Sequence, residues 1–212
     1  MLFFAIRGPD FWGDYGRILT GGIVRRSQSE SQPNQLLRTG PFIPPISFPF
    51  RHVVVTNDFR DSLTNANLGN FKFRTIEKQR IRKLPWERWD RDADLPARYP
   101  RGGEPEDYLF QGWHSRSAAK AMGQIWELVL PASARTGGIR VKRERPRKPG
   151  QRLWDVMVDG DSWLGDHFFQ SINQGYLVAT ETGANWLSAQ FGDWLTLRQC
   201  LPWDPGKLNA EP

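Results

Sequence analysis

The chain has 212 residues, of which 39% are hydrophobic, 13% aromatic and 25% charged, and its formal net charge is +6. This composition excludes a disordered or collagen-like chain and allows one large domain or two small ones. The chain has no run of about 18 apolar residues, which excludes a transmembrane helix, and no ordered secretory signal, so we expect a cytoplasmic protein. A single cysteine excludes an internal disulfide and a cysteine-based zinc site, and no cofactor is predicted.

The N-terminal half predicts short strands and one helix. The prolines between residues 27 and 49 remove backbone donors, so we expect an extended surface connection there. Three consecutive valines predict a strand, and Thr56 or Asn57 can cap the helix that follows because its side-chain oxygen accepts an unpaired N–H. In chain order the predicted elements are strands at 3–6 and 53–56, a helix from about 57 to 67 ended by Gly69, and strands at 71–76 and 81–86.

The second half predicts a basic loop between strands and then another strand–helix–strand unit. Pro131 closes one strand, and the Pro- and Gly-containing stretch after it favours a loop. The predicted elements are a turn-rich stretch at 90–107, a short helix at 115–123, a strand at 124–130, a loop at 131–151, strands at 153–158 and 176–180, a helix at 181–191 and a strand at 194–198.

Two segments of the chain match element by element. Thr56, Leu63 and Arg74 each stand 124 residues before Thr180, Leu187 and Arg198. An internal duplication would explain this match, and the alternative is that any strand–helix–strand segment shows the same pattern. We therefore predict an α+β fold with mixed or antiparallel sheets and short helices, containing two related strand–helix–strand units at 53–76 and 176–198.

The charge is unevenly distributed and suggests domain boundaries. Residues 140–152 carry seven basic groups and one acidic group, whereas residues 153–212 carry two basic and eight acidic groups. We expect an N-terminal half at 1–139, a basic loop or linker at 140–152 and a C-terminal half at 153–212, although one compact domain fits the same pattern.

Two basic segments are candidates for nucleic-acid binding. The segment 140–152 has no interleaved aromatic residues for base stacking, so we favour a solvated loop. The segment 72–91 alternates basic and apolar residues and is either an RNA platform or, as we prefer, the solvent face of a sheet. The candidate basic surface consists of Arg140, Lys142, Arg143, Arg145, Arg147 and Lys148.

The C-terminal third offers an acidic candidate surface. The stretch 159–167 gathers three carboxylates and an imidazole, but Gln170 stands where a calcium-binding loop of the EF-hand type requires glutamate. We therefore predict no metal site and favour a solvated turn that forms part of a contact surface. The candidate partner-binding residues are Asp155, Asp159, Asp161, Trp163, Asp166 and Glu181.

Catalytic signatures are absent from the sequence. His52, His114 and His167 lack the spacing of a helical metal site, and Cys200 is expected to be a small core residue. An enzyme of unrecognised type would draw on Asp166, His167 and His114.

Ten tryptophans are present, and most are expected in the core because each buries a large area. Those in predicted turns should be partly exposed, and tryptophan and arginine together anchor many protein–protein interfaces. The tryptophans in this group are Trp12, Trp89, Trp113 and Trp203.

Several loose patterns are shared with a known family. They are Val53-Val54-Val55-Thr56 with Leu63, Gly69 and Phe71-Lys72-Phe73-Arg74, then Leu84-Pro85-Trp86-Glu87-Arg88-Trp89-Asp90 leading to Tyr99-Pro100 and Glu104-Pro105, and finally Asp166-His167-Phe168-Phe169 with Gly175 to Thr180 and Leu187. Over about residues 50–110 and 155–200 the chain resembles a family of bacterial immunity proteins. Its members are encoded beside polymorphic or contact-dependent toxins and neutralise the cognate toxin by binding it. The resemblance implies a non-enzymatic binding role and transfers no functional residue.

Three functional hypotheses follow. The first is an immunity protein whose acidic C-terminal third suits the basic substrate cleft of a nuclease toxin. The second is a nucleic-acid-binding protein that uses the segments 72–91 and 140–152. The third is a toxin or enzyme of unrecognised type, which should be toxic on expression, whereas an immunity protein should be harmless alone.

Overall fold

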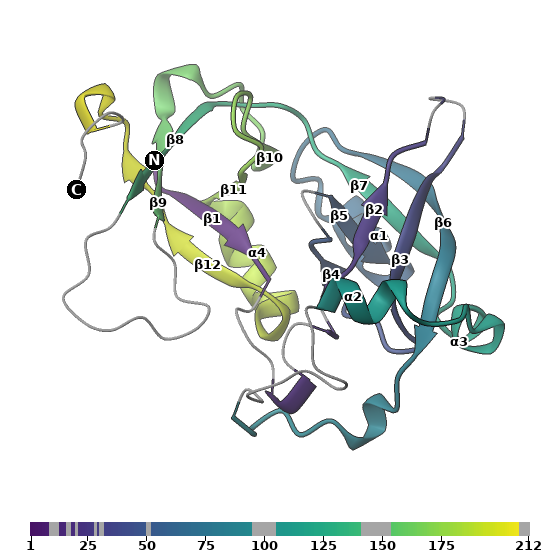
Figure 1. The fold of residues 1–212 in the computed structure, drawn as a ribbon. Coiled ribbons are helices and arrows are strands. Elements are labelled where there is room, and N and C mark those ends of the chain that lie inside the picture. The colour runs from purple at the N-terminus through teal and green to yellow at the C-terminus, as the bar shows by residue number, and fades with distance from the viewer. Residues whose placement is uncertain are drawn as a thin grey trace. The chain divides into compact units, whose positions relative to one another are not determined.

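The computed structural model describes residues 1–8, 13–15, 18–19, 21–27, 29, 32–49, 52–94, 105–140 and 154–207 (Figure 1). The chain forms two compact bodies that are interleaved in sequence. The terminal body contains residues 1–7, 67–71 and 130–212, and the central body contains residues 8–66 and 72–129. The predicted basic loop lies, apart from Arg140, outside the described residues, so its conformation and the predicted domain boundaries stay predictions.

The central body is built on a six-stranded sheet in the order β2-β3-β6-β7-β5-β4 (Figure 1). Only the neighbours β3 and β6 run parallel, and the other neighbouring strands are antiparallel. Its described strands are β2 (Ile23–Arg25), β3 (Asn34–Gly40), β4 (Ile46–Ser47), β5 (Val53–Thr56), β6 (Lys72–Lys83) and β7 (Ile125–Val129). Its described helices are α1 (Asn57–Ala66), α2 (Pro105–Phe110), α3 (Arg116–Ala121) and the 3-10 turns η1 (Gly13–Tyr15) and η2 (Trp86–Arg88).

Apolar residues of the central sheet pack against the helices. Ile76 and Ile81 of β6 are buried together with Ala118 and Met122, from α3 and its C-terminus. Phe59 and Leu63 of α1 are fully buried, and this helix packs against β5 and β7. The four-residue spacing of Phe59 and Leu63 places both on one face of α1, and packing of that face stabilises this short helix in the folded protein.

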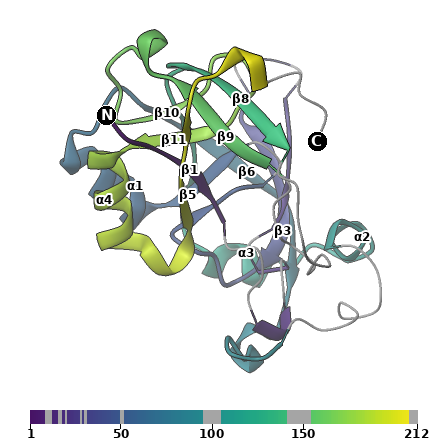
Figure 2. The same ribbon diagram turned by 90° about the vertical axis from the view of Figure 1, so that its left-hand side faces the viewer.

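The terminal body contains a four-stranded sheet, β10-β11-β1-β12, and a three-stranded sheet, β13-β9-β8. The helix α4 packs against β11 and β1, as Figure 2 shows. Cys200 is buried in the core of this body, as predicted. The described elements are β1 (Phe3–Arg7), β8 (Arg135–Arg140), β9 (Trp154–Asp159), η3 (Gly160–Ser162), β10 (Phe168–Gln170), β11 (Leu177–Thr180), α4 (Glu181–Phe191), η4 (Gly192–Trp194), β12 (Thr196–Gln199), β13 (Leu201–Pro202) and η5 (Pro205–Lys207).

The two related strand–helix–strand units are confirmed, and in each of them a third strand lies between the two strands. β7 runs antiparallel to both β5 and β6, and β1 runs antiparallel to both β11 and β12. The helix caps also correspond, because Thr56 Oγ1 accepts from the N–H of Phe59 at 3.4 Å and Thr180 Oγ1 from that of Gly183 at 3.5 Å. The α+β fold with mixed and antiparallel sheets therefore agrees with the sequence pattern.

The proline-rich stretch 27–49 differs from the expectation of a surface connection. It contains β3, in which Leu36 and Leu37 are almost completely buried. The prolines flank this strand without interrupting it, and its pairing with β6 has one register shift, between Gln35 and Leu37. Arg38 is also buried and donates hydrogen bonds to Leu19 O and Thr39 O, while burial lowers the pKa of its guanidinium to about 9.

Three other expectations need smaller corrections. The two strands predicted within 71–86 are one strand, β6, in which residues 72–75 pair with β7 and the stretch from Ile76 to Lys83 pairs with β3. The predicted loop at 131–151 includes β8, which pairs with β9 along its whole length. The first helix ends before Gly69, since Asn67 adopts the left-handed conformation with φ of 50°. Among the described residues, no helix is long and apolar enough to span a membrane.

Candidate functional site

The predicted acidic surface is largely engaged in contacts within the terminal body. Asp159 is 6% exposed and accepts from Arg135 Nη2 at 2.6 Å and Arg135 Nε at 3.0 Å. Asp155 forms an ion pair with Arg198, and Asp166 is buried. Two of the predicted acidic contacts are exposed, namely Asp161 and Glu181.

Trp163 and His167 hold the same region together. Trp163 Nε1 donates to Asp166 O at 2.8 Å, and its ring packs edge-on against Phe3. His167 Nδ1 lies 2.8 Å from Thr180 Oγ1, the oxygen that caps α4. The structure therefore gives Asp166 and His167 identifiable structural contacts in this turn. In the described part of the chain, no group of three potential metal ligands is arranged around a common point.

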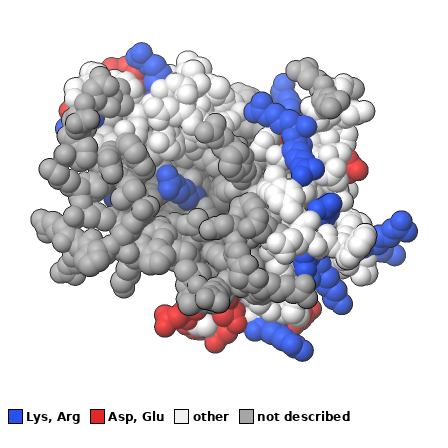
Figure 3. Space-filling view, viewed as in Figure 1, with Lys and Arg blue, Asp and Glu red and all other residues white. Residues whose placement is uncertain are grey.

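The basic residues of β6 also make internal hydrogen bonds. Lys78 Nζ donates to Ala119 O at 2.6 Å and to Gly123 O at 2.7 Å, which satisfies carbonyls at the end of α3. Figure 3 shows Lys and Arg side chains along the side of the central body that carries β6 and α3. The fraction of this basic surface that is free for phosphates is therefore smaller than the residue count suggests.

The alternative basic surface stays a prediction. Lys142, Arg143, Arg145, Arg147 and Lys148 lie outside the described residues, and only the backbone of Arg140 is described, at the end of β8.

The most exposed tryptophan in the described structure lies directly after α2. The side chain of Trp113 is 94% exposed, and Phe110, three residues earlier, is 44% exposed. Trp113 confirms the expectation for tryptophans in turns, and Trp89 and Trp203 are half-buried, whereas Trp12 lies outside the described residues. An exposed aromatic residue of this size is a common anchor of protein interfaces.

Four hydrogen bonds fix the segment that carries Trp113 to β6. Arg80 Nη1 donates to Phe110 O at 2.8 Å, and Arg82 Nη1 donates to Tyr108 O at 2.9 Å. On the other side of Trp113, the N–H of Ile81 donates to His114 Nδ1 at 3.1 Å and Ser115 N–H donates to Ile81 O at 2.7 Å. We call residues 108–115 with Arg25, Arg80 and Arg82 the Trp113 platform.

Close approach of Gly112 to β6 is part of this arrangement. A Cβ atom at Gly112 would lie 2.1 Å from Arg82 Nη1, so a side chain there would displace the guanidinium. The guanidinium of Arg82 also lies 4.1 Å from the centre of the Tyr108 ring. The platform is therefore ordered by interactions that come from β6.

A buried carboxylate in the central sheet is a second polar centre. Glu127 is 6% exposed; its Oε1 lies 2.6 Å from His52 Nδ1, and its Oε2 accepts from Asn34 Nδ2 at 2.9 Å. Burial alone would raise the pKa of Glu127, but the hydrogen bonds from His52 and Asn34 and the nearby charges of His52 and Arg74 lower it below its usual value of 4.5. The carboxylate is thus held ionised by three surrounding segments.

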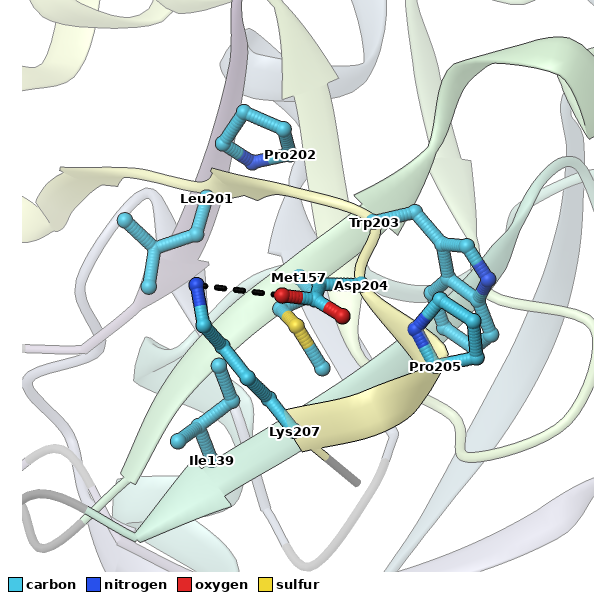
Figure 4. A pocket seen from close by; sticks show the side chains of 8 residues that line it. All are labelled: Ile139, Met157, Leu201, Pro202, Trp203, Asp204, Pro205 and Lys207. Carbon is cyan, nitrogen blue, oxygen red and sulfur yellow. Dashed lines mark ion pairs between the residues drawn. The ribbon is translucent and has the colours of Figure 1, made fainter. Parts of the chain in front are cut away.

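An apolar pocket of about 330 Å³ lies over β8, β9 and β13 (Figure 4). Lys207 Nζ forms an ion pair with Asp204 Oδ2 at 3.2 Å in its wall. Its lining residues are Ile139, Met157, Leu201, Pro202, Trp203, Asp204, Pro205 and Lys207.

Comparison with known proteins adds no relative. No protein-family model, curated protein or solved structure is significantly similar to this chain.

Sequence reasoning missed the Glu127 centre, although a single acidic residue in the apolar strand 124–130 signals a buried polar group. It also did not identify Phe110, which no local pattern distinguishes from a core residue.

Proposed function

We propose that this protein is a cytoplasmic binding protein of the immunity type, which neutralises a cognate bacterial toxin by protein–protein contact and has no enzymatic activity. The observation that carries the proposal is Trp113, a large apolar side chain that is 94% exposed on a hydrogen-bonded segment. Leaving such a side chain in water is unfavourable, and burying it in a partner would recover apolar surface without reordering the segment.

The acidic residues suit a supporting role in this function. Asp161 and Glu181 are exposed and remain candidate contacts, whereas Asp155, Asp159 and Asp166 make contacts within the terminal body. Charge reversal at Asp161 and charge neutralisation by Glu181→Gln, at the first residue of α4, test an acidic contact at exposed positions. Reversal at Asp159 would instead break its hydrogen bonds with Arg135.

Co-expression tests the function directly. The protein should be harmless when expressed alone, should co-purify with the product of an adjacent toxin gene, and should restore growth of cells that produce that toxin. Toxicity of this chain by itself, or growth arrest despite its presence, would contradict the proposal.

Nucleic-acid binding is a second candidate, favoured by the Lys and Arg side chains along the β6 side of the central body (Figure 3). It predicts an affinity for DNA or RNA that falls steeply with salt, because each neutralised phosphate releases counterions. The absence of binding to either polymer at low salt would remove it.

A further inference from the structure

We propose that the Trp113 platform binds an acidic segment of the partner protein, with Trp113 inserted between apolar side chains and the guanidinium groups next to carboxylates. This inference rests on the proposed binding function and names the chemistry of the partner. The carrying observation is an indole that is 94% exposed on a hydrogen-bonded segment, next to arginines of β2 and β6 that form no ion pair with a carboxylate among the described residues.

The platform is organised before any partner arrives. Its backbone is held on both sides of Trp113, by Arg80 and Arg82 before the tryptophan and by Ile81 after it. A segment held in this way loses little conformational freedom on binding, so most of the interaction energy of the indole is retained as affinity.

The charge of the platform selects the partner. In the described part of the structure, Arg25, Arg80 and Arg82 form no ion pair with a carboxylate. Arg80 and Arg82 each use one Nη1 donor for a backbone carbonyl, which leaves further N–H groups of each guanidinium for a ligand. Carboxylates are the protein groups that match guanidinium donors best.

The aromatic rings favour an acidic protein over a single-stranded nucleic acid. Stacking of successive bases requires several open ring faces. Here the guanidinium of Arg82 lies 4.1 Å from the centre of the Tyr108 ring and that of Arg25 lies 5.4 Å from the centre of the Phe110 ring. Among the described rings of the platform, the indole of Trp113 is the most exposed, at 94%, and one such ring fits an anchor side chain better than a run of bases.

The test measures binding of two labelled probes to the full chain by fluorescence anisotropy. One probe is a random copolymer of glutamate and tyrosine, and the other is an oligothymidylate of similar total charge. We expect the copolymer to bind and its affinity to fall as NaCl is raised, with weaker binding of the oligothymidylate. Absence of copolymer binding, or tighter and Trp113-dependent binding of the oligothymidylate, would overturn the inference.

Two variants locate the binding to the platform. Trp113→Ala should weaken copolymer binding by about tenfold or more, and Arg25→Glu by about tenfold, because both act on exposed side chains. Matched controls are Leu164→Ala, which removes another apolar side chain that is 70% exposed, and Lys72→Glu, which reverses an exposed charge on β6. Lys72 lies ten residues from Arg82 on the same strand, which is about 33 Å in an extended chain. Equal effects of the platform and control variants would overturn the inference.

The same variants separate this inference from the proposed function. In the co-expression assay, the Trp113→Ala variant should lose protection and the Leu164→Ala variant should retain it. This pair of results would support both the platform inference and the immunity function. Full protection by the Trp113→Ala variant would overturn the platform while leaving the immunity function intact. Failure of the unmodified chain to protect would contradict the function, whatever the copolymer shows.

Discussion

The two strand–helix–strand units can be compared residue by residue, and they differ at the centre of the inserted strand. In the central body, Glu127 lies between Val54 and Arg74 on the neighbouring strands. In the terminal body, the corresponding residue between Val178 and Arg198 is Ala5. Both positions are buried, at 6% and 3% exposure, so one sheet encloses a carboxylate where the other encloses a methyl group.

This difference shows that the scaffold itself does not require an acidic residue there. Burying a carboxylate costs desolvation energy that an alanine does not incur. In return, Glu127 joins Asn34 of β3 to His52, the residue before β5. We infer that the carboxylate specifies which segments meet in the larger, six-stranded sheet, a role that the shorter sheet does not need.

The largest losses of stability, of similar size in the two units, are expected when the buried leucine of each helix is truncated. Leu63→Ala and Leu187→Ala remove equivalent side chains that are 0% and 1% exposed, so each should lower the free energy of unfolding by about 2–5 kcal/mol. Urea denaturation followed by circular dichroism measures both. The exposed positions Asn65 and Gln190 on the same helices serve as alanine controls. A neutral effect at either leucine would break the equivalence of the two units.

The dependence of stability on pH should distinguish the two units, because Glu127 in the central body is replaced by Ala5 in the terminal body. Because the pKa of Glu127 is lowered in the folded protein, its stabilising contribution is present above the unfolded value and is lost as the pH falls through the folded value. Glu127→Gln should therefore lower the free energy of unfolding by about 1–3 kcal/mol at neutral pH and flatten its dependence on pH below about 4.5.

Denaturation curves at several pH values check this expectation. Ala5→Gly, at the equivalent position, is the control and should leave the acid dependence unchanged. The same acid slope in the Glu127→Gln variant and the unmodified chain would contradict the role of the carboxylate.

Removal of the two helix caps should lower the free energy of unfolding by smaller amounts, which differ between the two units. Thr180 is 2% exposed and its Oγ1 also lies 2.8 Å from His167 Nδ1, whereas Thr56 is half-buried. Thr180→Ala should therefore cost about 1–2 kcal/mol and Thr56→Ala about 0.5–1 kcal/mol. Serine at either position keeps the capping oxygen and provides the control. A larger loss at Thr56 would reverse the proposed order.

The smallest effect on stability is expected at Trp113. Its side chain is 94% exposed, so Trp113→Ala should change the free energy of unfolding by about 0.5 kcal/mol or less. Thermal melts of this variant and the unmodified chain should overlap. A large loss of stability would show that the indole serves the fold and would remove it as a binding anchor.

Local patterns predicted much of this fold because several elements carry their own signals. The three valines of β5 and the threonine caps are such signals, and the offset of 124 residues is preserved in the register of both sheets. β3 was not predicted, since the flanking prolines dominate the composition of its surroundings while the strand itself contains none. The number of prolines in this stretch therefore led to a wrong prediction of a surface connection. Their positions, all outside the strand, are compatible with β3.

The candidate sites depended more on tertiary structure. Trp113 could be predicted as exposed because it follows turn residues, but the platform arises from side chains of β6 that are about 30 residues away in sequence. The acidic surface was overestimated for the same reason. Asp159 belongs to an acidic run in sequence, yet Arg135 on the neighbouring strand β8 binds it.

Isothermal titration of the full chain with a toxin that co-purifies with it, the partner that we propose, tests the central claim most directly. We expect Trp113→Ala to weaken this binding by about 30-fold, as for an interface anchor, while Leu164→Ala leaves the Kd unchanged. Equal dissociation constants for the Trp113→Ala variant and the unmodified chain would contradict the claim that this exposed indole anchors the partner.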